Sequence, residues 1–572
     1  MMIAAFAVDY DGTLAEHGRV AQATSEALQR LKASGVKLLL VTGRELPDLQ
    51  QVFPRHNLFD VIVAENGALL YWPARREERP LAPPPPEALL RRLKRARVEP
   101  LSVGRSIIAT WRPNESKVLE AISESKLEWH IVFNKEAVMA LPSGVNKASG
   151  LAAALDALEI SPLNVFAVGD AENDHALLAA CGYRAAVANA VEALKRHADI
   201  VTEAPNGRGI VELIEQFLRD PAAALTAKVR RHDLPLGIAQ QDTAHALALQ
   251  PNGLTLITGR SSGGKSRLAV LLMERIAQHG AQLCVVDPEG DYERFEQLTQ
   301  LGDAHRPPTA QEALQLLQRP QNKLVLNLMA IDLSLRPQFF TQLSAALAEL
   351  RARTGRPHWI VVDEAHHVIP AAAQAAMLAS PRQLAGGILI SSEPKSLSRS
   401  FLRAVRYVIT VGAAAAESLR AYCEAVQAPA PGVAGPVPSS GHALFWDRAS
   451  SQPAQTVPIE SPSHEHQRHI RKYAQGNLGE DKSFYFRGSN GALNLRAQNL
   501  TLFLQMAEGV DDGTWLYHLK RHDYSRWFIE AIKDEDLASE ARQLEERLAS
   551  DARQSRRAMR ELIARRYTAP AD

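Results

Sequence analysis

The sequence is poor in the features that mark an extracellular or membrane-bound protein. Its 572 residues include three cysteines, Cys181, Cys284 and Cys423, which lie far apart without the CxxC spacing of a zinc ribbon. No apolar run approaches the roughly 20 residues that a membrane span needs. No basic segment precedes the short apolar run at the N-terminus. We therefore expect a soluble, cytoplasmic protein with no membrane partner.

The sequence also lacks an excess of charge of either sign. Lys and Arg number 65, Asp and Glu number 64, and the net charge is +1. The overall charge therefore does not indicate a polyanionic partner, and any nucleic-acid surface would have to be a local patch. A chain of this length is expected to form three or four domains of about 150 residues each.

What the sequence does contain is an alternation of apolar, strand-like runs with helical patterns. This order favours βαβ units and parallel sheets, and so an α/β fold class. The proline run "APPPP" at 82–86 opens an irregular stretch that interrupts the first alternation. The expected organisation is an α/β domain at 1–217 with an insertion at about 73–140, a linker at 218–234, a second α/β domain at 235–450, and an α-rich C-terminal region of unknown role at 461–572.

Two carboxylates end the first apolar run, "FAVDYDGTL" at 6–14. Asp9 and Asp11 are two residues apart, so in an extended segment they point the same way and repel unless a cation or proton is shared. A later run, "FAVGDAEND", ends in Asp170 and Asp174. Carboxylate oxygens are the ligands that Mg²⁺ prefers, and these residues predict a magnesium site.

A hydroxyl and an ammonium group accompany these acids. Thr42 directly follows the apolar run "VKLLLV", and Lys147 lies in "GVNKASGL". A strand-end hydroxyl and an ammonium group are what a phosphate dianion needs beside a metal ion.

These four motifs, in this order, resemble those of haloacid-dehalogenase (HAD) superfamily phosphatases, and "AENGA" at 64–68 resembles the subclass IIB, Cof-like and sugar-phosphatase branch. The resemblance implies a Rossmann-like core with an α+β cap between Thr42 and Lys147. It implies that Asp9 attacks phosphorus to form an aspartyl-phosphate, while Asp11 protonates the leaving oxygen and then activates water. Thr42 and Lys147 would hold the phosphoryl oxygens.

The resemblance also implies a cofactor and a substrate class. The substrate would be a small phosphorylated metabolite such as a sugar phosphate, although a phosphomutase uses the same residues and stays open. The residues implied to bind Mg²⁺ are Asp9, Asp11, Asp170 and Asp174.

A second phosphate-binding motif begins the second α/β domain. "GRSSGGKS" at 259–266 follows the apolar run "LTLIT" and fits the P-loop pattern GxxxxGK[ST]. Its glycines, Gly259 and Gly264 among them, let backbone N–H groups wrap the phosphates of ATP, the expected substrate. Lys265 would reach the β- and γ-phosphates, and Ser266 would bind Mg²⁺.

An acidic pair about 100 residues later completes this motif set. In "HWIVVDEAHH", Asp363 would hold Mg²⁺ and Glu364 would polarise the attacking water. The segment "CVVDPEGDYERF" at 284–295 resembles the second-strand signature of HerA/FtsK-type ATPases, and "GHALFWD" resembles their terminal strand. The resemblance implies a RecA-like ATPase domain and a homo-oligomer, such as a hexameric ring.

Three functions fit these motifs. The preferred one is a Mg²⁺-dependent HAD phosphatase fused to a ring-forming ATPase. A HerA-like DNA motor or genome-defence ATPase with a nucleotide- or end-processing phosphatase is the second. It is suggested by the HerA-like motifs and by four aromatics that lie among cations and could stack on bases, Trp515, Tyr517, Tyr524 and Trp527. An amphipathic helical hairpin that packs internally or docks on a partner is the preferred interpretation of these aromatics. A polynucleotide kinase-phosphatase is the third, although Glu364 suits hydrolysis by water.

Overall fold

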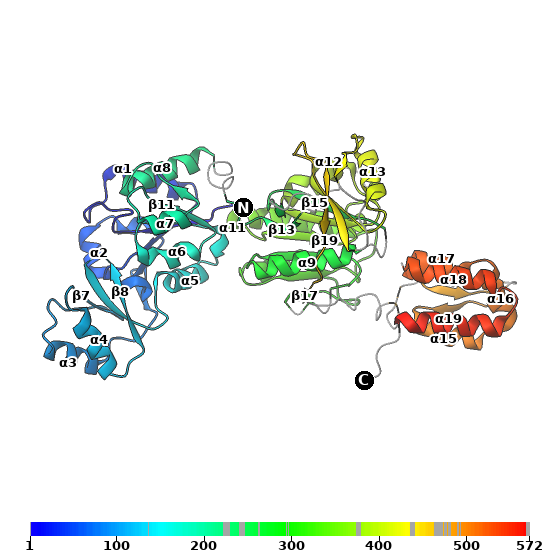
Figure 1. The fold of residues 1–572 in the computed structure, drawn as a ribbon, viewed down its shortest axis with the longest axis horizontal. Helices are drawn as coiled ribbons and strands as arrows, with labels where there is room; N and C mark the ends of the chain where they lie inside the picture. Colours follow the sequence, from blue (N-terminus) through cyan, green and yellow to red (C-terminus); the bar gives the residue numbers. More distant parts are fainter. Residues whose placement is uncertain are drawn as a thin grey trace.

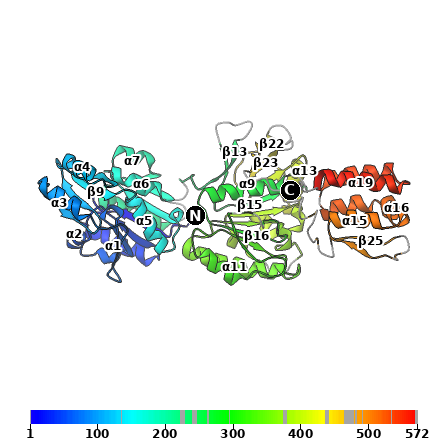
Figure 2. The same cartoon turned by 90° about the horizontal axis from the view of Figure 1, so that it is seen from below.

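The chain folds into three groups of elements that follow one another along the long axis of the molecule (Figure 1; Figure 2). Each group has its own apolar core. Among the described helices, none combines the length and the hydropathy needed to cross a lipid bilayer. The computed structural model describes residues 2–134, 136–220, 229–238, 246–260, 264–292, 295, 297–372, 379–434, 441–462, 473, 478, 482–488, 491, 493–532 and 534–567.

The first group is an α/β unit on an eight-stranded sheet. Its elements are β1 (Ala5–Asp9), α1 (Gln22–Ala33), β2 (Lys37–Val41), α2 (Leu46–Val52), η1 (His56–Leu58), β3 (Val61–Ala64), η2 (Glu65–Gly67), β4 (Leu69–Trp72), β5 (Glu77–Pro80), α5 (Lys147–Ala157), η3 (Pro162–Asn164), β10 (Val165–Gly169), η4 (Glu172–Asp174), α6 (His175–Ala179), β11 (Tyr183–Ala186), α7 (Glu192–His197), β12 (Ile200–Val201) and α8 (Asn206–Arg219). The strand order is β12-β11-β10-β1-β2-β3-β4-β5, parallel as far as β3 and antiparallel beyond it. Strands β1 and β10 are buried along their whole length, which is why their sequences are continuous apolar runs.

A smaller unit is inserted between β5 and α5. Its elements are α3 (Glu87–Arg95), β6 (Ser102–Val103), β7 (Ile108–Trp111), α4 (Glu115–Glu124), β8 (Trp129–Asn134) and β9 (Ala137–Pro142). The strands form an antiparallel sheet in the order β6-β7-β9-β8, and α3 and α4 pack on it through a separate apolar cluster. Strand β8 also contacts η4, the short helix that follows β10, so this unit lies against the carboxyl edge of the larger sheet.

The second group is built on a ten-stranded sheet. Its elements are β13 (Leu234–Ile238), β14 (Ala246–Leu249), β15 (Leu254–Thr258), α9 (Lys265–Gln278), β16 (Leu283–Asp287), β17 (Thr299–Leu301), α10 (Ala310–Leu317), β18 (Leu324–Asn327), α11 (Arg336–Thr354), β19 (Trp359–Val362), η5 (Ala365–His367), η7 (Pro381–Leu384), β20 (Gly387–Ser391), η8 (Pro394–Ser396), α12 (Arg399–Ala404), β21 (Val405–Val411), α13 (Ala415–Val426), β22 (Val433–Ala434), β23 (His442–Asp447) and β24 (Ala454–Pro458). The order is β17-β18-β16-β19-β20-β15-β21-β23-β24-β22, with β17 to β21 parallel and β23 antiparallel to both neighbours.

The third group is mostly helical and encloses aromatic side chains. Its elements are β25 (Phe484–Phe486), β26 (Leu495–Ala497), α15 (Leu500–Gly509), α16 (Asp512–Lys520), α17 (Asp523–Trp527), η9 (Phe528–Ile532), α18 (Glu535–Arg547) and α19 (Ala552–Tyr567). Trp515 and Tyr524 are fully buried and stack with ring centroids 4.5 Å apart, and the Trp515 indole N–H donates to Ser555 Oγ over 2.9 Å. Trp527 is 7% exposed. Of the two roles expected from the sequence, packing or docking on a partner, the structure shows internal packing for these three aromatics, whereas Tyr517 is partly exposed.

A buried hydrogen bond joins the first group to the second. His358 directly precedes β19 and Asn164 directly precedes β10, and His358 Nε2 lies 2.9 Å from Asn164 Oδ1. His358 Nδ1 accepts the backbone N–H of Gln282 over 2.7 Å, so Nε2 carries the proton and donates. Burial holds the pKa of His358 well below its usual range, in keeping with a neutral ring.

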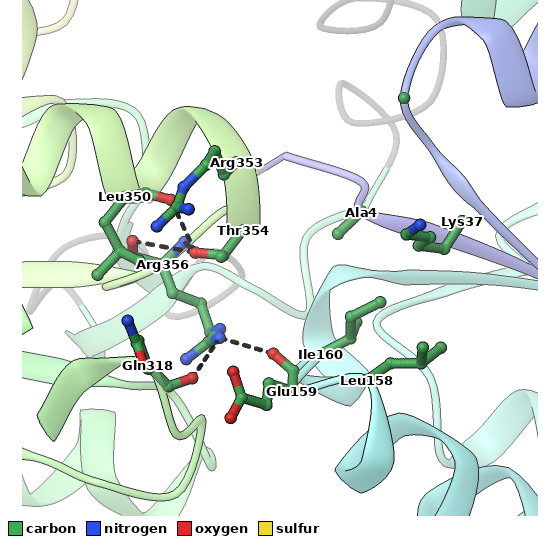
Figure 3. Close-up of a pocket in the computed structure, with 11 residues that line it drawn as sticks. Ala4, Lys37, Leu158, Glu159, Ile160, Gln318, Leu350, Arg353, Thr354 and Arg356 are labelled. Atoms are coloured by element: carbon green, nitrogen blue, oxygen red, sulfur yellow. Dashed lines mark hydrogen bonds between the residues drawn. The ribbon is translucent and has the colours of Figure 1, made fainter. Parts of the chain in front are cut away.

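Arg356 reinforces this junction. It is fully buried, and its guanidinium donates to the carbonyl oxygens of Glu159 at 2.7 Å and Gln318 at 2.9 Å, one in each group (Figure 3). Gly355 has a φ of 72°, and a Cβ there would lie 2.4 Å from Asn164 Nδ2. A cavity of about 280 Å³, lined by residues of both groups, lies beside Arg356. The junction therefore combines buried polar contacts with a cavity beside them.

We predict that His358→Ala destabilises the junction by about 2 to 6 kcal/mol, because it leaves Asn164 Oδ1 and the Gln282 N–H without their partner, and each orphaned buried polar group costs about 1 to 3 kcal/mol. Urea unfolding measures the change. His305→Ala, at an exposed position of the second group, is the control and should lie within experimental error of the parent chain. Equal free energies of unfolding for His358→Ala and the parent chain would show that the His358 hydrogen bonds do not stabilise the junction.

Candidate active site

The carboxyl edge of the first sheet gathers most of the residues singled out in the N-terminal sequence. Strands β1, β2 and β10 are neighbours and parallel, so their carboxyl ends meet at one edge. Asp9 ends β1, Thr42 follows β2, and Asp170 follows β10. Ligands of open α/β sheets bind at this edge, where neighbouring connections diverge to opposite sides.

Lys147 and three carboxylates form a buried charged cluster at this edge. Lys147 Nζ lies 2.6 Å from Asp9 Oδ1 and 2.7 Å from Asp174 Oδ1. Asp9, Asp170 and Asp174 each place one carboxylate oxygen within 4.8 Å of the others. All four side chains are buried. The structure therefore brings together residues that are up to 165 positions apart in the sequence.

The charges in this cluster shift one another. Burial, together with the nearby Asp174 and Asp170 carboxylates, holds the pKa of Asp9 well above its usual range, and Lys147 opposes this shift. Burial disfavours the charge on Lys147, but Asp174 and Asp9 outweigh it and raise the pKa of the ammonium group. One monovalent cation thus faces three buried carboxylates, and a divalent cation would complete the charge balance.

The donor set fits Mg²⁺. Both oxygens of Asp174 already accept hydrogen bonds, one from Lys147 and the other from the backbone N–H groups of Asp170 and Ala171. Asp9 and Asp170, which accept side-chain hydrogen bonds at Oδ1 from Lys147 and Thr13, could bind the ion directly, with Asp174 reaching it through water. An all-oxygen site that retains several waters is what Mg²⁺ prefers.

Asp11 lies apart from this cluster. Its two carboxylate oxygens accept from Arg44 Nε and Nη2, each over 2.7 Å, in a bidentate pair. Arg44 also donates to Asp48 over 2.6 Å. The structure thus holds Asp11 through Arg44 beside the cluster rather than within it, unlike the four-carboxylate magnesium set that the sequence implies.

Thr42 is held by backbone contacts on both sides. Its N–H donates to the Val63 carbonyl over 2.8 Å, its carbonyl accepts from the Asn66 N–H over 2.9 Å, and its hydroxyl accepts from the Arg44 N–H over 3.1 Å. The hydroxyl is buried at the end of β2. The turn η2, which contains Asn66, therefore fixes the position of Thr42.

Three residues of this site were not identified from the sequence. The Thr13 hydroxyl donates to Asp170 Oδ1 over 2.9 Å. Arg44 Nε donates to Asp11 Oδ2, and Glu65 Oε1 accepts the backbone N–H of Arg105. Thr13 belongs to the "DGT" turn and Arg44 to "TGR", so both motifs contained the signal. Glu65 lies in "AENGA", but its contacts could not be predicted from that motif, because its partners are backbone N–H groups about 40 residues away.

The second candidate site lies at the carboxyl edge of the second sheet. Gly264, with a φ of 96°, precedes α9, and Lys265 is the first residue of that helix. Lys265 Nζ donates to the carbonyl oxygens of Gly259 over 2.8 Å and Arg260 over 3.0 Å. Ser266 follows in the first turn of the helix. The loop residues 261–263 of the expected P-loop lie outside the described residues.

The acidic pair follows β19 at the same edge. Asp363 is buried and accepts the hydroxyl of Tyr292 at Oδ2 over 2.9 Å. Glu364 follows with a φ of 38°, and its Oε2 lies 3.4 Å from His366 Nδ1. Strand β20 separates β19 from β15, the strand that leads to Lys265. The acidic pair and Lys265 thus follow strands that end at the same edge of the sheet, with one strand, β20, between them.

Known proteins resemble the chain in two separate segments. Residues 6–81 and 106–214 match the haloacid dehalogenase-like hydrolase family, and residues 241–343 match the central domain of helicase HerA. Phosphoglycolate phosphatase 2 of Saccharolobus solfataricus is 31% identical over 220 residues, which are 37% of this chain and 91% of that protein. Phosphoglycolate phosphatase of Aeropyrum pernix is 32% identical over 227 residues, 37% of this chain and 92% of that protein.

A solved structure of a haloacid dehalogenase-like hydrolase from Bacteroides thetaiotaomicron is 20% identical, with 38% of this chain and 99% of that chain covered and a TM-score of 0.33. The assignment depends instead on the sequence relatives, whose length the chain covers almost completely, and on the family matches. Through its N-terminal third, the chain belongs to the haloacid dehalogenase-like hydrolases, as a phosphatase joined to a HerA-like domain.

Proposed function

We propose that residues 1–217 form a Mg²⁺-dependent phosphatase that hydrolyses a small phosphorylated metabolite through an aspartyl-phosphate. The observation that carries the proposal is the convergence of Asp9, Asp170, Asp174 and Lys147 at one sheet edge. Phosphoglycolate, the substrate in the names of the relatives, is the first compound to test. Sugar phosphates, expected from the sequence, are the second.

Each residue has a defined part in the proposed reaction. Asp9 attacks phosphorus, a bond from its carboxylate oxygen to phosphorus forms, and the ester P–O bond breaks as Asp11 gives its proton to the leaving oxygen. Asp11 then takes a proton from water, whose oxygen attacks phosphorus and releases Asp9 and phosphate. Lys147 and Thr42 hold the phosphoryl oxygens throughout. Mg²⁺, when bound by Asp9 and Asp170, supplies positive charge to the phosphoryl group.

Arg44 holds the carboxylate of Asp11 in one orientation. Its bidentate contact, with Nε and Nη2 each 2.7 Å from a carboxylate oxygen, fixes Asp11 beside the cluster. The phosphoryl group of an arriving substrate offers Arg44 a second anionic partner.

We also propose that residues 235–450 hydrolyse ATP as a ring-forming P-loop ATPase, with 461–572 as a separate C-terminal domain. This proposal is supported by four residues that lie at one edge of a mainly parallel sheet: Lys265, Ser266, Asp363 and Glu364. Ring assembly is supported by the match to the HerA central domain. The second candidate, a HerA-like DNA motor, depends on the same match, because Trp515, Tyr524 and Trp527 are buried and only Tyr517, of the aromatics considered for base stacking, is partly exposed.

We predict that Asp9→Asn lowers phosphate release from p-nitrophenyl phosphate by at least about 1,000-fold, because the variant lacks the attacking oxygen. Glu172→Gln, at an exposed position near the cluster, is the matched control and should retain the parent rate. Unchanged turnover by Asp9→Asn would refute the assignment of the nucleophile.

We predict that Mg²⁺ stabilises the chain and that this effect requires Asp170. At 100 times the dissociation constant, an ion that binds the folded state alone adds about 2.7 kcal/mol to the free energy of unfolding. The melting temperature should therefore be higher in Mg²⁺ than in EDTA for the parent chain and for Glu172→Gln. It should be the same in both for Asp170→Asn. An equal Mg²⁺ effect in Asp170→Asn would place the ion elsewhere.

We predict that Lys265→Ala abolishes ATP hydrolysis while p-nitrophenyl phosphate turnover stays within about twofold of the parent chain, because the two sites lie on different sheets. Malachite-green detection of phosphate measures ATP turnover, and absorbance measures the aryl product. ATP hydrolysis that survives in Lys265→Ala but is lost in Asp9→Asn would assign it to the phosphatase site instead.

A further inference from the structure

The third group of elements lies at the carboxyl edge of the second sheet. The first and third groups lie on opposite sides of the second group (Figure 1; Figure 2). His358, which bonds to the first group, precedes β19, whereas Glu289, which contacts the third group, follows β16. These two strands are parallel neighbours, so their amino ends face the first group and their carboxyl ends face the third. The third group therefore lies on the side of the sheet where the proposed ATPase residues gather.

An ion pair joins the third group to this edge. Lys482 Nζ lies 2.8 Å from Glu289 Oε1, and the two side chains are 31% and 9% exposed, respectively. The Lys482 carbonyl accepts the indole N–H of Trp527 over 2.9 Å, so its backbone is held by the aromatic core of the third group. Because the carboxylate is mostly buried, water and salt screen this pair less than a pair on the open surface.

The loop that carries Glu289 also binds the acidic pair of the second site. Asp287 ends β16 and accepts the backbone N–H groups of Glu289 over 3.2 Å and of Tyr292 over 2.8 Å, which folds the loop back on the end of the strand. The Tyr292 hydroxyl donates to Asp363 Oδ2 over 2.9 Å. The loop at 287–292 therefore supplies a hydrogen-bond donor to the carboxylate proposed to hold Mg²⁺.

The Glu289 carboxylate also approaches the turn that follows Glu364. His367 Nε2 lies 3.8 Å from Glu289 Oε1, and the His367 N–H donates to the Glu364 carbonyl over 2.9 Å. Burial lowers the pKa of His367 to about 3, so its ring is neutral near pH 7 and does not balance the charge on Glu289. Lys482 supplies positive charge at a shorter distance. A mostly buried carboxylate that loses such a partner has to move or to take up a proton.

We propose that Lys482 is a positioning residue for ATP hydrolysis. By holding Glu289, it fixes the loop at 287–292 and the turn η5 beside Asp363 and Glu364. This inference rests on the proposed ATPase function and gives the third group a part in it. Lys482 acts here through Glu289 and not on the nucleotide. Loss of the contact would therefore leave ATP binding in place and misplace the residues that orient Mg²⁺ and the attacking water.

The kinetics of ATP hydrolysis by the full chain test the role of Lys482. Lys482→Ala should lower kcat about 3- to 30-fold, the range for residues that act through a neighbour, and leave KM for ATP within about twofold. Lys482→Arg keeps the positive charge and should restore most of the parent kcat. Lys520→Ala, at an exposed position of the same group, is the matched control and should change neither constant. Circular dichroism checks that each variant is folded.

A double substitution tests whether Lys482 acts through Glu289. Glu289→Gln keeps the size of the side chain but removes the charge that Lys482 holds, so it should also lower kcat. Adding Glu289→Gln to Lys482→Ala removes the unbalanced charge, so the double variant should have a kcat no lower than that of Lys482→Ala. Multiplication of the two separate losses would show that the residues act independently and would overturn the proposal.

The outcomes separate this role from the proposed function. A parent chain that hydrolyses ATP, with unchanged kcat in Lys482→Ala, would overturn the inference and leave the proposed ATPase intact. A higher kcat in Lys482→Ala would also overturn it, because the contact would then be inhibitory. An equal loss of kcat in Lys520→Ala would assign the effect to the general surface charge and would overturn it as well. A parent chain that does not hydrolyse ATP would refute the proposed ATPase itself, and this role with it.

Discussion

The buried contact of Lys147 with Asp9 and Asp174 is the interaction on which the N-terminal site depends. Three carboxylates within 4.8 Å of one another would repel strongly in a buried environment, and one ammonium group at 2.6 and 2.7 Å offsets part of that repulsion. The remaining imbalance favours a divalent cation. The same lysine therefore permits the fold to bury the acids and prepares the site for a metal ion and a phosphoryl group.

The junction at Asn164 and His358 relates this site to the second sheet. Both residues directly precede strands, β10 and β19, that end in acidic residues proposed for the two sites. The strands thus meet near their amino ends, and the acids lie at their far ends. The phosphatase and the HerA-like domain are therefore joined by buried hydrogen bonds as well as by the chain itself.

The sequence predicted those parts of the site that depend on local patterns. Continuous apolar runs that end in Asp9, Thr42 and Asp170 predicted parallel strands, and parallel strands place their ends at one edge. The bidentate pair of Arg44 with Asp11 and the capture of the 104–106 loop by Glu65 depend on tertiary contacts across 33 and about 40 residues. No local periodicity encodes such contacts. The cations beside the C-terminal aromatics suggested base stacking, whereas burial of Trp515 and Tyr524 decides for core packing.

The proposed phosphatase reaction depends on phosphorylation of Asp9 during turnover. Acid quenching of the chain during steady-state hydrolysis, followed by peptide mapping with mass spectrometry, measures this directly. We expect one phosphoryl group on the peptide that contains Asp9, removable by hydroxylamine as expected for an acyl phosphate, and absent from Asp9→Asn. A phosphoryl group on another residue, with turnover dependent on that residue, would refute Asp9 as the nucleophile.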